Sequence, residues 1–591
     1  MHTNLREFLG ILRRENELVE VSAPVDPYLE LAEIHRRVID EQGPALLFTN
    51  VKGSPFPVVT NLFGTTRRVE LAFGTRPEQF VKRLVGALDS LIPPSPKALW
   101  NERDLLLQAL KVGTAKASFS NAPVLQVLKD HAPLDGLPVL TSWQEDGGPF
   151  VTLPLVYTES PSTGQHNLGM YRMQVFDART TGMHWQIHKG GGFHYHEAEK
   201  RGAALPVTVF LGGPPALIAS AIAPVPENVP ELLLASLIAG KKISLVQNPR
   251  SSHRLVAEAE FAISGKVPPF KRRLEGPFGD HYGYYSLAHD FPFFEIDHVW
   301  HRKDAIYPAT IVGKPRQEDY YLGEFLQRLL SPVFPIVMSG VKDLWTYAET
   351  GFHPLAAAIV RESYQRESLA YAFRILGEGQ LTLTKFLILT DQMVELSDFP
   401  VLLEKVLERF HPHTDLFILN HTSHDTLDYT GLKLNHGSKA VLMGIGSPIR
   451  SLPREYSGGA LPGIGSAAPY CPGCLVVSGA SYSDDPGLPE RLLDAAGERL
   501  KDWPLVILAD DTSIVSNQTS FLWTVFTRFN PAADMFAKSA VSKHHLQYEL
   551  PIVIDARMKP GYPDELVPRE DIVRQVSQRW KEYFPYFPNR K

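Results

Sequence analysis

The last third of the sequence contains an internal repeat, and this repeat restricts the possible fold more than any other feature. The segments Phe386–Asp391 and Arg409–Phe417 recur as Leu505–Asp510 and Arg528–Phe536, and every matched residue is displaced by the same 119 positions. Between the two blocks of each copy, apolar residues follow the spacing of one helix face. These residues are Leu402, Leu403, Val406 and Leu407, then Phe521, Leu522, Val525 and Phe526. The pattern predicts a duplicated α/β unit, with strand, acidic turn and helix in each copy, over about 380–446 and 500–557.

The remainder of the chain divides into regions of different pattern, as expected for a length of 591 residues, which is too long for one core. Residues 1–125 alternate helical and strand-like runs such as Ala45–Phe48 and Pro57–Thr60, which favours an α/β unit. From 126 to 318, short β-rich runs are divided by Gly and Pro, which indicates a compact barrel or sandwich. Residues 319–336 are predicted to be a linker helix, and 337–591 a C-terminal α/β domain that contains both repeats.

Charge and hydropathy exclude two classes of partner. The 59 basic and 65 acidic residues are interspersed and give a net charge of -6, which is not the pattern of a nucleic-acid-binding protein. Residues 202–226 are uncharged, but prolines and Gly212–Gly213 interrupt them, so we predict a strand, a turn and a short buried element instead of a membrane span.

The N-terminus predicts a packed helix. It has charges where a signal peptide requires an apolar run, whereas Leu5, Phe8, Leu9 and Leu12 have helical spacing.

The only cysteines, Cys471 and Cys474, are separated by Pro-Gly and run into an apolar stretch, so we expect reduced structural thiols. A redox pair or half of a zinc site are the alternatives. Together these patterns favour a cytoplasmic protein.

Six residues between 167 and 280 carry the main chemical signal. Asn167, His188 and Glu231 offer one amide oxygen, one imidazole and one carboxylate, a set that suits Mn²⁺ or Mg²⁺ with positions left for a phosphate. Each also has a simpler interpretation. Glu231 with Asn228 forms a capping-box pattern, His188 could bond within a strand, and Asn167 could be a turn residue.

The other three residues are an arginine and two carboxylates, Arg172, Glu275 and Asp280, a set suited to proton transfer. Either carboxylate could instead serve the turn at Gly276–Gly279. Asn167 and Arg172 are an odd number of residues apart and would face opposite sides of a regular strand unless Gly169 introduces a bulge.

Three further patterns are less specific. Gly190–Gly192 would permit close backbone approach and positive φ, as contact with a phosphate or ring requires, although a simple turn uses the same residues. A C-terminal helix around Ile572–Trp580 presents apolar residues that could pack on a partner or within the chain. Five histidines between 410 and 436 suggest a cluster, but the second copy replaces two of them, so we expect a structural origin. These histidines are His411, His413, His421, His424 and His436.

Several motifs, in this order, resemble the UbiD family of decarboxylases, which use prenylated FMN. They are Asn-x-Gly-x-Tyr-Arg at 167–172, Pro-Val-Pro at 224–226 ahead of Glu231, and Glu-Gly-Pro-Phe-Gly-Asp at 275–280. The resemblance implies an N-terminal α/β unit, a central split β-barrel that binds the flavin, and a C-terminal α/β domain that dimerises. The expected fold class is therefore α+β with α/β parts, with the C-terminal domain internally duplicated.

The resemblance also implies residue roles. Arg172, Glu275 and Asp280 would form the catalytic network, and Asn167, His188 and Glu231 would bind a divalent metal on the flavin phosphate, with K⁺ nearby. The expected cofactor-binding residues are Thr152, Asn167, Leu168, Gly169, Met170, Arg172, Ile187, His188, Ala221, Ile222, Pro224, Glu231 and Lys385. Family C-terminal segments match parts of both copies, so the sequence leaves open which copy contacts the flavin domain.

The implied reaction is decarboxylation of an unsaturated acid, and Asp at 280 favours an aromatic substrate. The length of the chain resembles that of the family branch that acts in menaquinone biosynthesis, which implies a hydroxynaphthoate-type acid as substrate. A flavin prenyltransferase would supply the cofactor, and a homodimer or higher homo-oligomer is expected. A flavin- or metal-dependent oxidoreductase or hydrolase on a split barrel is the alternative. A non-catalytic assembly protein is a third possibility, but it would not require this set of polar residues.

Overall fold

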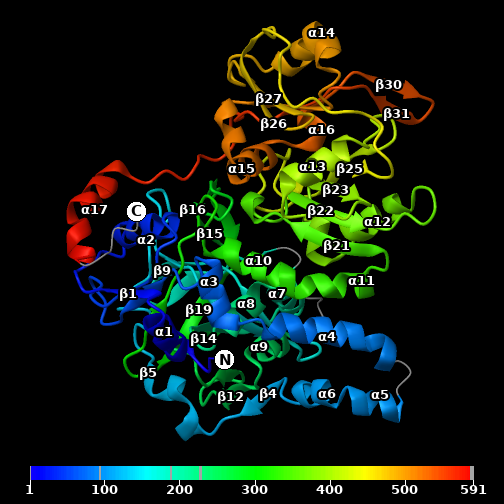
Figure 1. Ribbon diagram of the computed structural model, residues 1–591. Coiled ribbons are helices and arrows are strands. Elements are labelled where there is room, and N and C mark those ends of the chain that lie inside the picture. The colour runs from blue at the N-terminus through cyan, green and yellow to red at the C-terminus, as the bar shows by residue number, and fades with distance from the viewer. Residues whose placement is uncertain (1, 92–94, 187–188, 225–228, 586–591) are drawn as a thin grey trace. The chain divides into compact units, whose positions relative to one another are not determined.

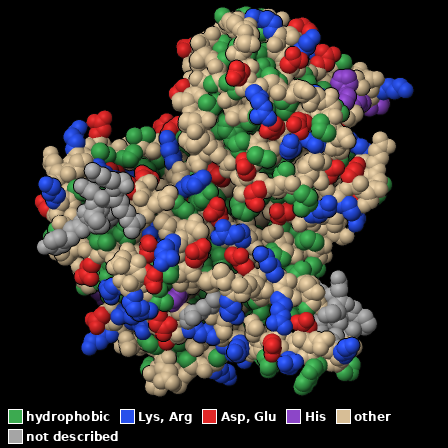
Figure 2. Space-filling view, viewed as in Figure 1, with side chains coloured by type: hydrophobic (Ala, Val, Ile, Leu, Met, Phe, Trp, Pro, Cys, Tyr) green, Lys and Arg blue, Asp and Glu red, His purple; other side chains and the backbone are tan. Residues whose placement is uncertain are grey.

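The computed structural model describes residues 2–91, 95–186, 189–224 and 229–585. It contains two compact units, Met1–Leu329 together with Asp564–Lys591, and Leu330–Pro563 (Figure 1). Within the described residues, no helix is long and apolar enough to cross a membrane. On the face seen in Figure 2, basic and acidic side chains are interspersed, as they are along the sequence.

The first unit begins with a small α/β layer. Its four-stranded sheet has the order β1 (Leu18–Val21), β2 (Ala45–Phe48), β3 (Val58–Thr60) and β20 (Tyr307–Pro308). The helices are α1 (Leu5–Arg14), α2 (Glu30–Asp40), α3 (Thr66–Phe73), α4 (Arg76–Leu91), α5 (Pro96–Asn101) and α6 (Arg103–Ala109). The prediction of a packed N-terminal helix is confirmed, because α1 buries Leu5, Phe8, Leu9 and Leu12.

The centre of the first unit is a curled, open sheet of nine strands joined by antiparallel pairs. The strands are β5 (Val127–Lys129), β6 (Phe150–Val151), β7 (Leu155–Glu159), β8 (His166–Met170), β9 (Met173–Asp177), β10 (Thr180–Gly182), β11 (Leu205–Leu211), β14 (Phe261–Val267) and β19 (Phe293–His301). Their order is β6-β9-β10-β19-β14-β11-β7-β8, and β5 pairs with β19. This curled sheet agrees with the expected split barrel, and its apolar side chains share one core with the N-terminal sheet.

Short elements surround the curled sheet. They are α7 (Gly190–Lys200), α8 (Ala216–Ile222), α9 (Glu231–Ala239), α10 (Glu318–Leu330), β4 (Thr114–Lys116), β12 (Ile243–Gln247), β13 (Arg254–Val256), β15 (Arg273–Glu275), β16 (Phe278–Gly279), β17 (Tyr285–Ser286) and β18 (His289–Phe291). The uncharged stretch after residue 202 forms β11, a turn and the buried helix α8, as predicted.

The C-terminal helix α17 (Glu570–Tyr583) completes the first unit by packing on α2. The buried carboxylate of Glu30 accepts hydrogen bonds from Gln575 Nε2 at 3.1 Å, from Tyr583 Oη at 2.5 Å and from Arg579. This placement differs from the sequence-based domain 337–591. The apolar face of α17 packs within the chain and not on a partner, because Ile572 and Val576 join the core of the first unit.

The second unit consists of two sheets with the same topology. The first has the order β21 (Val341–Thr346), β22 (Leu355–Val360), β23 (Phe386–Thr390), β25 (His436–Gly444) and β24 (Leu416–Ser423). The second has the order β26 (Ile464–Cys471), β27 (Cys474–Gly479), β28 (Leu505–Ala509), β32 (Ile552–Asp555) and β29 (Met535–Phe536). In both, three central parallel strands lie between antiparallel edges. The duplication is therefore confirmed, and it begins earlier in each copy than the sequence pattern indicated, because β21 and β22 correspond to β26 and β27.

The helices of the second unit are α11 (Phe334–Val337), α12 (Glu367–Leu376), α13 (Phe399–Leu407), α14 (Leu488–Leu500), α15 (Gln518–Arg528) and α16 (Pro531–Asp534), with a hairpin β30 (Ser539–Ser542) and β31 (His545–Tyr548). Two pairs of these helices follow the same repeat, α12 with α14 and α13 with α15. All eight predicted apolar residues on α13 and α15 are buried in one core shared by both copies. The backbone N–H of Phe399 donates to Gln518 Oε1 at 3.0 Å, which joins the starts of the two equivalent helices.

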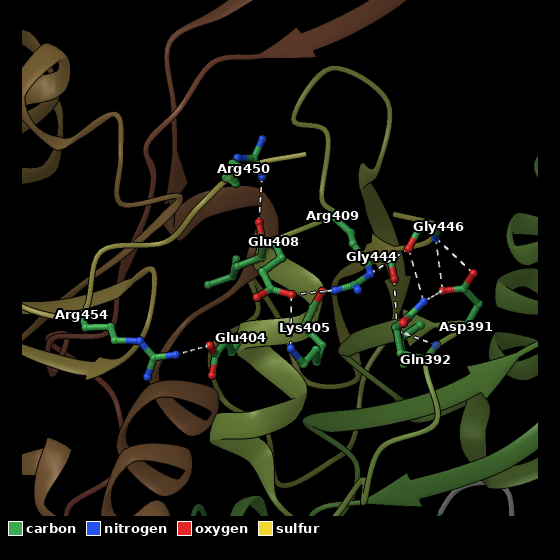
Figure 3. A network of polar contacts seen from close by, with 12 residues as sticks. Asp391, Gln392, Glu404, Lys405, Glu408, Arg409, Gly444, Gly446, Arg450 and Arg454 are labelled. Atoms are coloured by element: carbon green, nitrogen blue, oxygen red, sulfur yellow. Dashed lines mark hydrogen bonds and ion pairs between the residues drawn. The ribbon is translucent and has the colours of Figure 1, made fainter. Parts of the chain in front are cut away.

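Polar contacts fix the end of α13 to the loop that follows β25 (Figure 3). Arg409 donates from Nε to the carbonyl of Gly446 at 2.8 Å and from Nη1 to Glu408 at 2.8 Å. Both carboxylate oxygens of Asp391 accept from the N–H of Gly446, at 3.1 and 3.2 Å. These bonds join the residues that follow α13 and β23 to the loop after β25.

The two cysteines of this unit lie side by side in the core, as the sequence indicated for structural thiols. Cys471 and Cys474 face each other across the β26–β27 turn, and both are free and buried. Burial raises the pKa of the Cys474 thiol well above its usual value. Across the described ranges, no three His, Cys, Asp or Glu side chains are placed to hold a metal ion.

Candidate functional site

The candidate site begins where the curled sheet is interrupted. Strand β8 ends at Met170 and β9 begins at Met173, so Tyr171 and Arg172 form a break between them. The pairing of β7 with β8 is continuous through Gly169, so Gly169 does not introduce a bulge. Because β8 ends before Arg172, the side chain of Arg172 does not have to follow the alternation of a regular strand, which would place it on the face opposite Asn167.

Arg172 lies at the centre of a buried network that includes both predicted carboxylates. Its Nε donates to Glu275 Oε1 at 3.0 Å, its Nη1 bonds to Asp280 Oδ2, and its Nη2 donates to Ser286 Oγ at 2.9 Å. The guanidinium lies 4.9 Å from the centre of the Phe278 ring. Each of the three side chains, Arg172, Glu275 and Asp280, is less than a tenth exposed.

An imidazole borders each carboxylate on the side away from Arg172. His184 Nδ1 lies 2.7 Å from Glu275 Oε2, and His281 Nδ1 contacts Asp280 Oδ1. The backbone N–H of His281 also donates to Asp280 Oδ1, at 2.7 Å. The five groups therefore form a continuous row in which basic and acidic side chains alternate.

The charges in this row determine which groups are ionised. Burial alone would raise the pKa of Glu275, but the positive charge of Arg172 and the contact with His184 lower it to about 2. The pKa of Asp280 is lowered further below its usual value, because its burial is outweighed by His281 and Arg172 together. Both carboxyl groups are therefore ionised near neutral pH in this arrangement.

Two residues hold the turn between Glu275 and Asp280 in place. The carboxylate of Asp146 accepts from the N–H of Gly279 at 2.8 Å and of Trp143 at 2.9 Å, and burial raises its pKa to about 6. The amide oxygen of Gln174 accepts from the N–H of Gly276 at 2.9 Å. Both ends of the turn are thus hydrogen-bonded to neighbouring segments.

The segment that returns from the second unit braces the other side of the site. The N–H of Tyr285 donates to the carbonyl of Asp564, and the N–H of Leu566 donates to the carbonyl of Gly283, both at 3.0 Å. Leu566 is buried against Trp143 and Tyr285. These two bonds form a short antiparallel bridge between residues 283–285 and 564–566. Residues 283–285 belong to the segment that joins Asp280 to Ser286, and both of these residues contact Arg172.

A second group of predicted residues gathers at the other end of β8. Glu231 accepts from the N–H of Leu168 at 2.9 Å, and burial raises the pKa of its carboxyl group. The Nδ2 atom of Asn167 is buried and has no hydrogen-bond partner among the described residues. Gly190 lies so close that a Cβ there would be 2.2 Å from Asn167 Oδ1. The Glu231 carboxylate and the Oδ1 atom of Asn167 are oxygens of the kind that a hard cation binds, whereas the unsatisfied Nδ2 atom is a donor and fits an acceptor such as a phosphate oxygen.

Two of the simpler interpretations are wrong at this end. Helix α9 starts at Glu231 with Pro230 as its N-cap, so Glu231 is not the third helical residue that a capping box requires, and Asn228 lies outside the described residues. Gly190–Gly192 form the first turn of the 11-residue helix α7, so they are neither a simple turn nor a segment with the positive φ that such glycines permit. Their backbone amides give α7 an N-terminus that fits an anion such as a phosphate.

The remaining expected cofactor residues are distributed as follows. Leu168, Gly169 and Met170 lie on β8, Ala221 and Ile222 end α8, which packs on β8, and Pro224 follows it. Thr152 Oγ1 accepts from the N–H of Thr310 at 3.1 Å. Lys385 lies in the second unit, where its Nζ is 2.7 Å from Asp428 Oδ2. Ile187 and His188 lie outside the described residues.

Sequence reasoning did not identify His184, His281, Ser286 or Asp146 as parts of the site. The adjacent pair Asp280–His281 was a usable signal, because an imidazole beside a carboxylate is a common acid/base arrangement. His184 offered no such signal, because it is far from Glu275 along the chain.

Comparison with known proteins identifies the family. Three family models match: 3-octaprenyl-4-hydroxybenzoate carboxy-lyase N-terminal domain at 9–88, its Rift-related domain at 115–315 and its C-terminal domain at 320–444. The chain belongs to the UbiD family. It is accordingly a UbiD-type carboxy-lyase. The match to the C-terminal model ends with β25, so it contains the first α/β copy and not the second.

Individual relatives span nearly the whole chain. A Chlamydia trachomatis serovar D protein, named only as uncharacterized, is 53% identical over 586 residues, covering 98% of this chain and 100% of its own. A Chlamydia pneumoniae protein, named as part of a 4-hydroxybenzoate decarboxylase, is 52% identical and covers 98% of each chain.

Solved structures support the fold of this UbiD-family chain. The vanillic acid decarboxylase of Sedimentibacter hydroxybenzoicus in closed form has a TM-score of 0.68 at 23% identity, over 77% of this chain and 95% of that one. The UbiD-class enzyme HmfF from Pelotomaculum thermopropionicum, in complex with FMN, has a TM-score of 0.62 at 24% identity, over 78% and 98%.

Proposed function

We propose that this UbiD-type carboxy-lyase catalyses the reversible, non-oxidative decarboxylation of an aromatic carboxylic acid, with prenylated FMN as cofactor. The observation that carries the proposal is the buried row of Arg172 between Glu275 and Asp280. A guanidinium can orient a carboxylate through paired hydrogen bonds, and a neighbouring carboxyl group can exchange a proton with the carbon that loses CO₂.

The residues at the far end of β8 are assigned to the cofactor. Asn167 and Glu231, together with His188, would bind Mn²⁺ or Mg²⁺ against the flavin phosphate, and the N-terminus of α7 would contact the same anion. K⁺ is proposed nearby, and Thr152, Lys385 and the backbone from Leu168 to Arg172 are proposed to contact the flavin. A solved UbiD-class HmfF is described as a complex with prenylated FMN, which supports this choice.

The protein itself has three tasks in this reaction. Prenylated FMN, when bound, supplies the electron sink for cleavage of the bond to CO₂. Arg172 holds the substrate carboxylate and thereby orients the bond that breaks. Glu275 returns a proton to the carbon left by CO₂, and burial of the row excludes bulk water from that step.

The substrate is proposed to be a hydroxylated aromatic acid. The relative named for 4-hydroxybenzoate decarboxylase and the vanillic acid and 3,4-dihydroxybenzoic acid decarboxylases of the same fold favour this class. Within it, we keep a hydroxynaphthoate-type precursor of menaquinone as a specific candidate. A homodimer or higher homo-oligomer is proposed in solution, and a flavin prenyltransferase is proposed to supply the cofactor.

A substrate panel tests the proposal directly. Protein produced together with a flavin prenyltransferase should carry prenylated FMN by visible spectrum and mass, and should release CO₂ from one or more hydroxybenzoates or hydroxynaphthoates. Glu275→Gln should keep fold and flavin but lose about 10²–10⁴ in rate, because the amide cannot donate the proton. Turnover of this variant near the wild-type rate would remove Glu275 from the mechanism.

The metal assignment has its own test. Glu231→Ala should lower bound metal and flavin together, measured by elemental analysis and flavin absorbance of the purified protein. Pro230→Ala, which changes the neighbouring helix cap without removing a carboxylate, is the matched control and should retain both. Full metal and flavin content in Glu231→Ala would contradict the assignment.

A further inference from the structure

We infer that His184 supplies the proton that Glu275 delivers, so that the pair works as one proton-handling unit. The inference rests on the proposed function for its role in turnover, but the shared proton itself is a property of this chain alone. His184 acts through Glu275 and does not touch the reacting carbon, so it is a positioning residue for the proton donor.

The need for such a residue follows from the charge state of Glu275. A carboxylate that is paired with Arg172 and His184 carries no proton near neutral pH, and therefore has nothing to donate. Some neighbouring group must load it in each cycle. Imidazole is the side chain that gains and loses a proton between about pH 5 and 8, and His184 Nδ1 is 2.7 Å from Glu275 Oε2.

Glu275 accepts this proton more readily than Asp280 does. Each oxygen of Glu275 has a single partner in the row, Arg172 on Oε1 and His184 on Oε2. In contrast, Asp280 Oδ1 accepts both the backbone N–H and the ring of His281, while Oδ2 bonds to Arg172. Protonation of Asp280 would sacrifice more favourable contacts, so the row directs the proton to Glu275.

Substrate binding provides the trigger for transfer. A substrate carboxylate that takes guanidinium hydrogen bonds from Arg172 competes with Glu275 for the same positive charge. Glu275 then loses a stabilising partner of its ionised form, and its pKa rises. The proton therefore becomes available only when an acid occupies the site.

The transfer balances without any additional reactant. Imidazolium His184 gives its Nδ1 proton to the Glu275 carboxylate, producing neutral imidazole and a carboxylic acid. Glu275 then gives that proton to the carbon whose bonding electron pair remained when CO₂ left. Water returns a proton to His184, whose side chain is 11% exposed and so can exchange with solvent.

The other groups that face His184 are few. Arg172 lies beyond Glu275, and the pKa of His289 on β18 is lowered by burial and by the nearby charge of His184. The ring of Phe291, also on β18, is centred 4.2 Å from the imidazole. Among these described neighbours Glu275 carries the negative charge, so its carboxylate is the acceptor assigned to the proton on His184.

The first test uses protein without flavin and does not depend on turnover. Nitrogen NMR of histidine-labelled protein, with the His184 signal assigned through His184→Gln or His184→Asn, follows the imidazole across a pH series. We expect the titration curve of His184 to change clearly in Glu275→Gln, because the acceptor carboxylate is gone. The same curve in both proteins would overturn the shared proton.

The second test uses flavin-loaded enzyme. In the wild type, kcat/KM should fall as pH rises and the imidazole loses its proton. His184→Gln, which keeps an N–H donor but cannot transfer a proton, should lower kcat about 10²-fold or more and remove that pH dependence. The matched variant His281→Gln, which replaces the imidazole beside Asp280, should still show the decrease of kcat/KM as pH rises, whatever its absolute rate.

Three outcomes separate the possibilities. A falling limb that persists in His184→Gln would overturn the inference even though the enzyme is active. Restoration of rate in His184→Ala by added imidazole would support it, since a purely structural role would not be rescued by a proton carrier. If no panel acid is decarboxylated, the proposed function fails, and the NMR comparison still decides whether His184 and Glu275 share a proton.

Discussion

Arg172 shows how a single side chain can organise a site, because three of its nitrogens bond to three different partners. We expect Arg172→Lys to lower kcat/KM about 10²-fold or more, since an ammonium cannot reproduce this planar fork and misplaces the substrate. Ser286→Ala, which removes one neutral partner of the same guanidinium, should lose less than about 10-fold. Equal losses in the two variants would contradict the central role of Arg172.

The low pKa of Glu275 predicts a pH dependence of stability. In the folded protein this pKa is about 2, against an ordinary value of 4.5, so the folded state binds fewer protons between those values than the unfolded state does. The stabilisation is complete above about pH 4.5 and is lost as the pH falls towards 2. Urea unfolding from about pH 6 to 3 should therefore show a steeper loss in wild type than in Glu275→Gln. Parallel curves would argue against the ion pair.

At the residue scale, the sequence indicated part of the site. Arg172, Glu275 and Asp280 could be found because each belongs to a short Gly-containing motif with local chemistry. His184 and Ser286 could not, because their contacts depend on how β10 and the β16–β17 hairpin approach Arg172 in space. The capping interpretation of Glu231 was wrong because α9 starts after Pro230, later than the pattern indicated.

At the scale of elements, the segment that returns from the second unit supports the catalytic turn. Leu566→Ala should destabilise the first unit by about 2–4 kcal/mol and speed hydrogen exchange at 280–286, because Leu566 is buried against Trp143 and Tyr285. Val567→Ala is the matched control, since Val567 is 57% exposed. Unchanged exchange at 280–286 in Leu566→Ala would show that the bridge does not support the turn.

The two equivalent helices of the second unit offer a symmetric prediction. Val406 on α13 and Val525 on α15 are separated by the repeat distance, and both are fully buried. Val406→Asn and Val525→Asn should each destabilise the protein by about 2–4 kcal/mol, since each variant places a side-chain amide without a hydrogen-bond partner in an apolar core. Val401→Asn, at a site 40% exposed on α13, should have little effect. Thermal unfolding measures all three.

Elements with strong periodicity were predictable and those without it were not. Helix α10 accounts for most of the helix predicted at 319–336, because its apolar spacing is regular, and it ends at Leu330, ahead of Pro332 and Pro335. Strands β21 and β22 have counterparts in β26 and β27, but the sequence did not reveal this part of the duplication. Strands in a sheet accept many apolar residues, so topology can persist after residue identity has diverged.

At the scale of the whole molecule, the location of α17 changes what truncation should do. A chain that ends near residue 565 lacks the helix that covers α2 and binds Glu30, so its first unit should melt at lower temperature. Its oligomeric state should stay that of the full chain, because this face of α17 is used internally. Calorimetry and light scattering measure the two effects. Loss of oligomers without loss of stability would instead assign this face of α17 to a partner.

The location of α17 also has a consequence for biosynthesis. A ribosome that has finished the last strand of the curled sheet must still add all of Leu330–Pro563 before α17 exists, which takes about 10 to 50 seconds at roughly 5–20 residues per second. Throughout that interval α2 lacks the helix α17 that packs on it, and Gly283–Tyr285 lack their hydrogen bonds to Asp564 and Leu566. A released, truncated chain that ends at residue 563 should therefore protect the second unit from protease while α2 remains open to cleavage, so the unit that is translated first is the last to be completed.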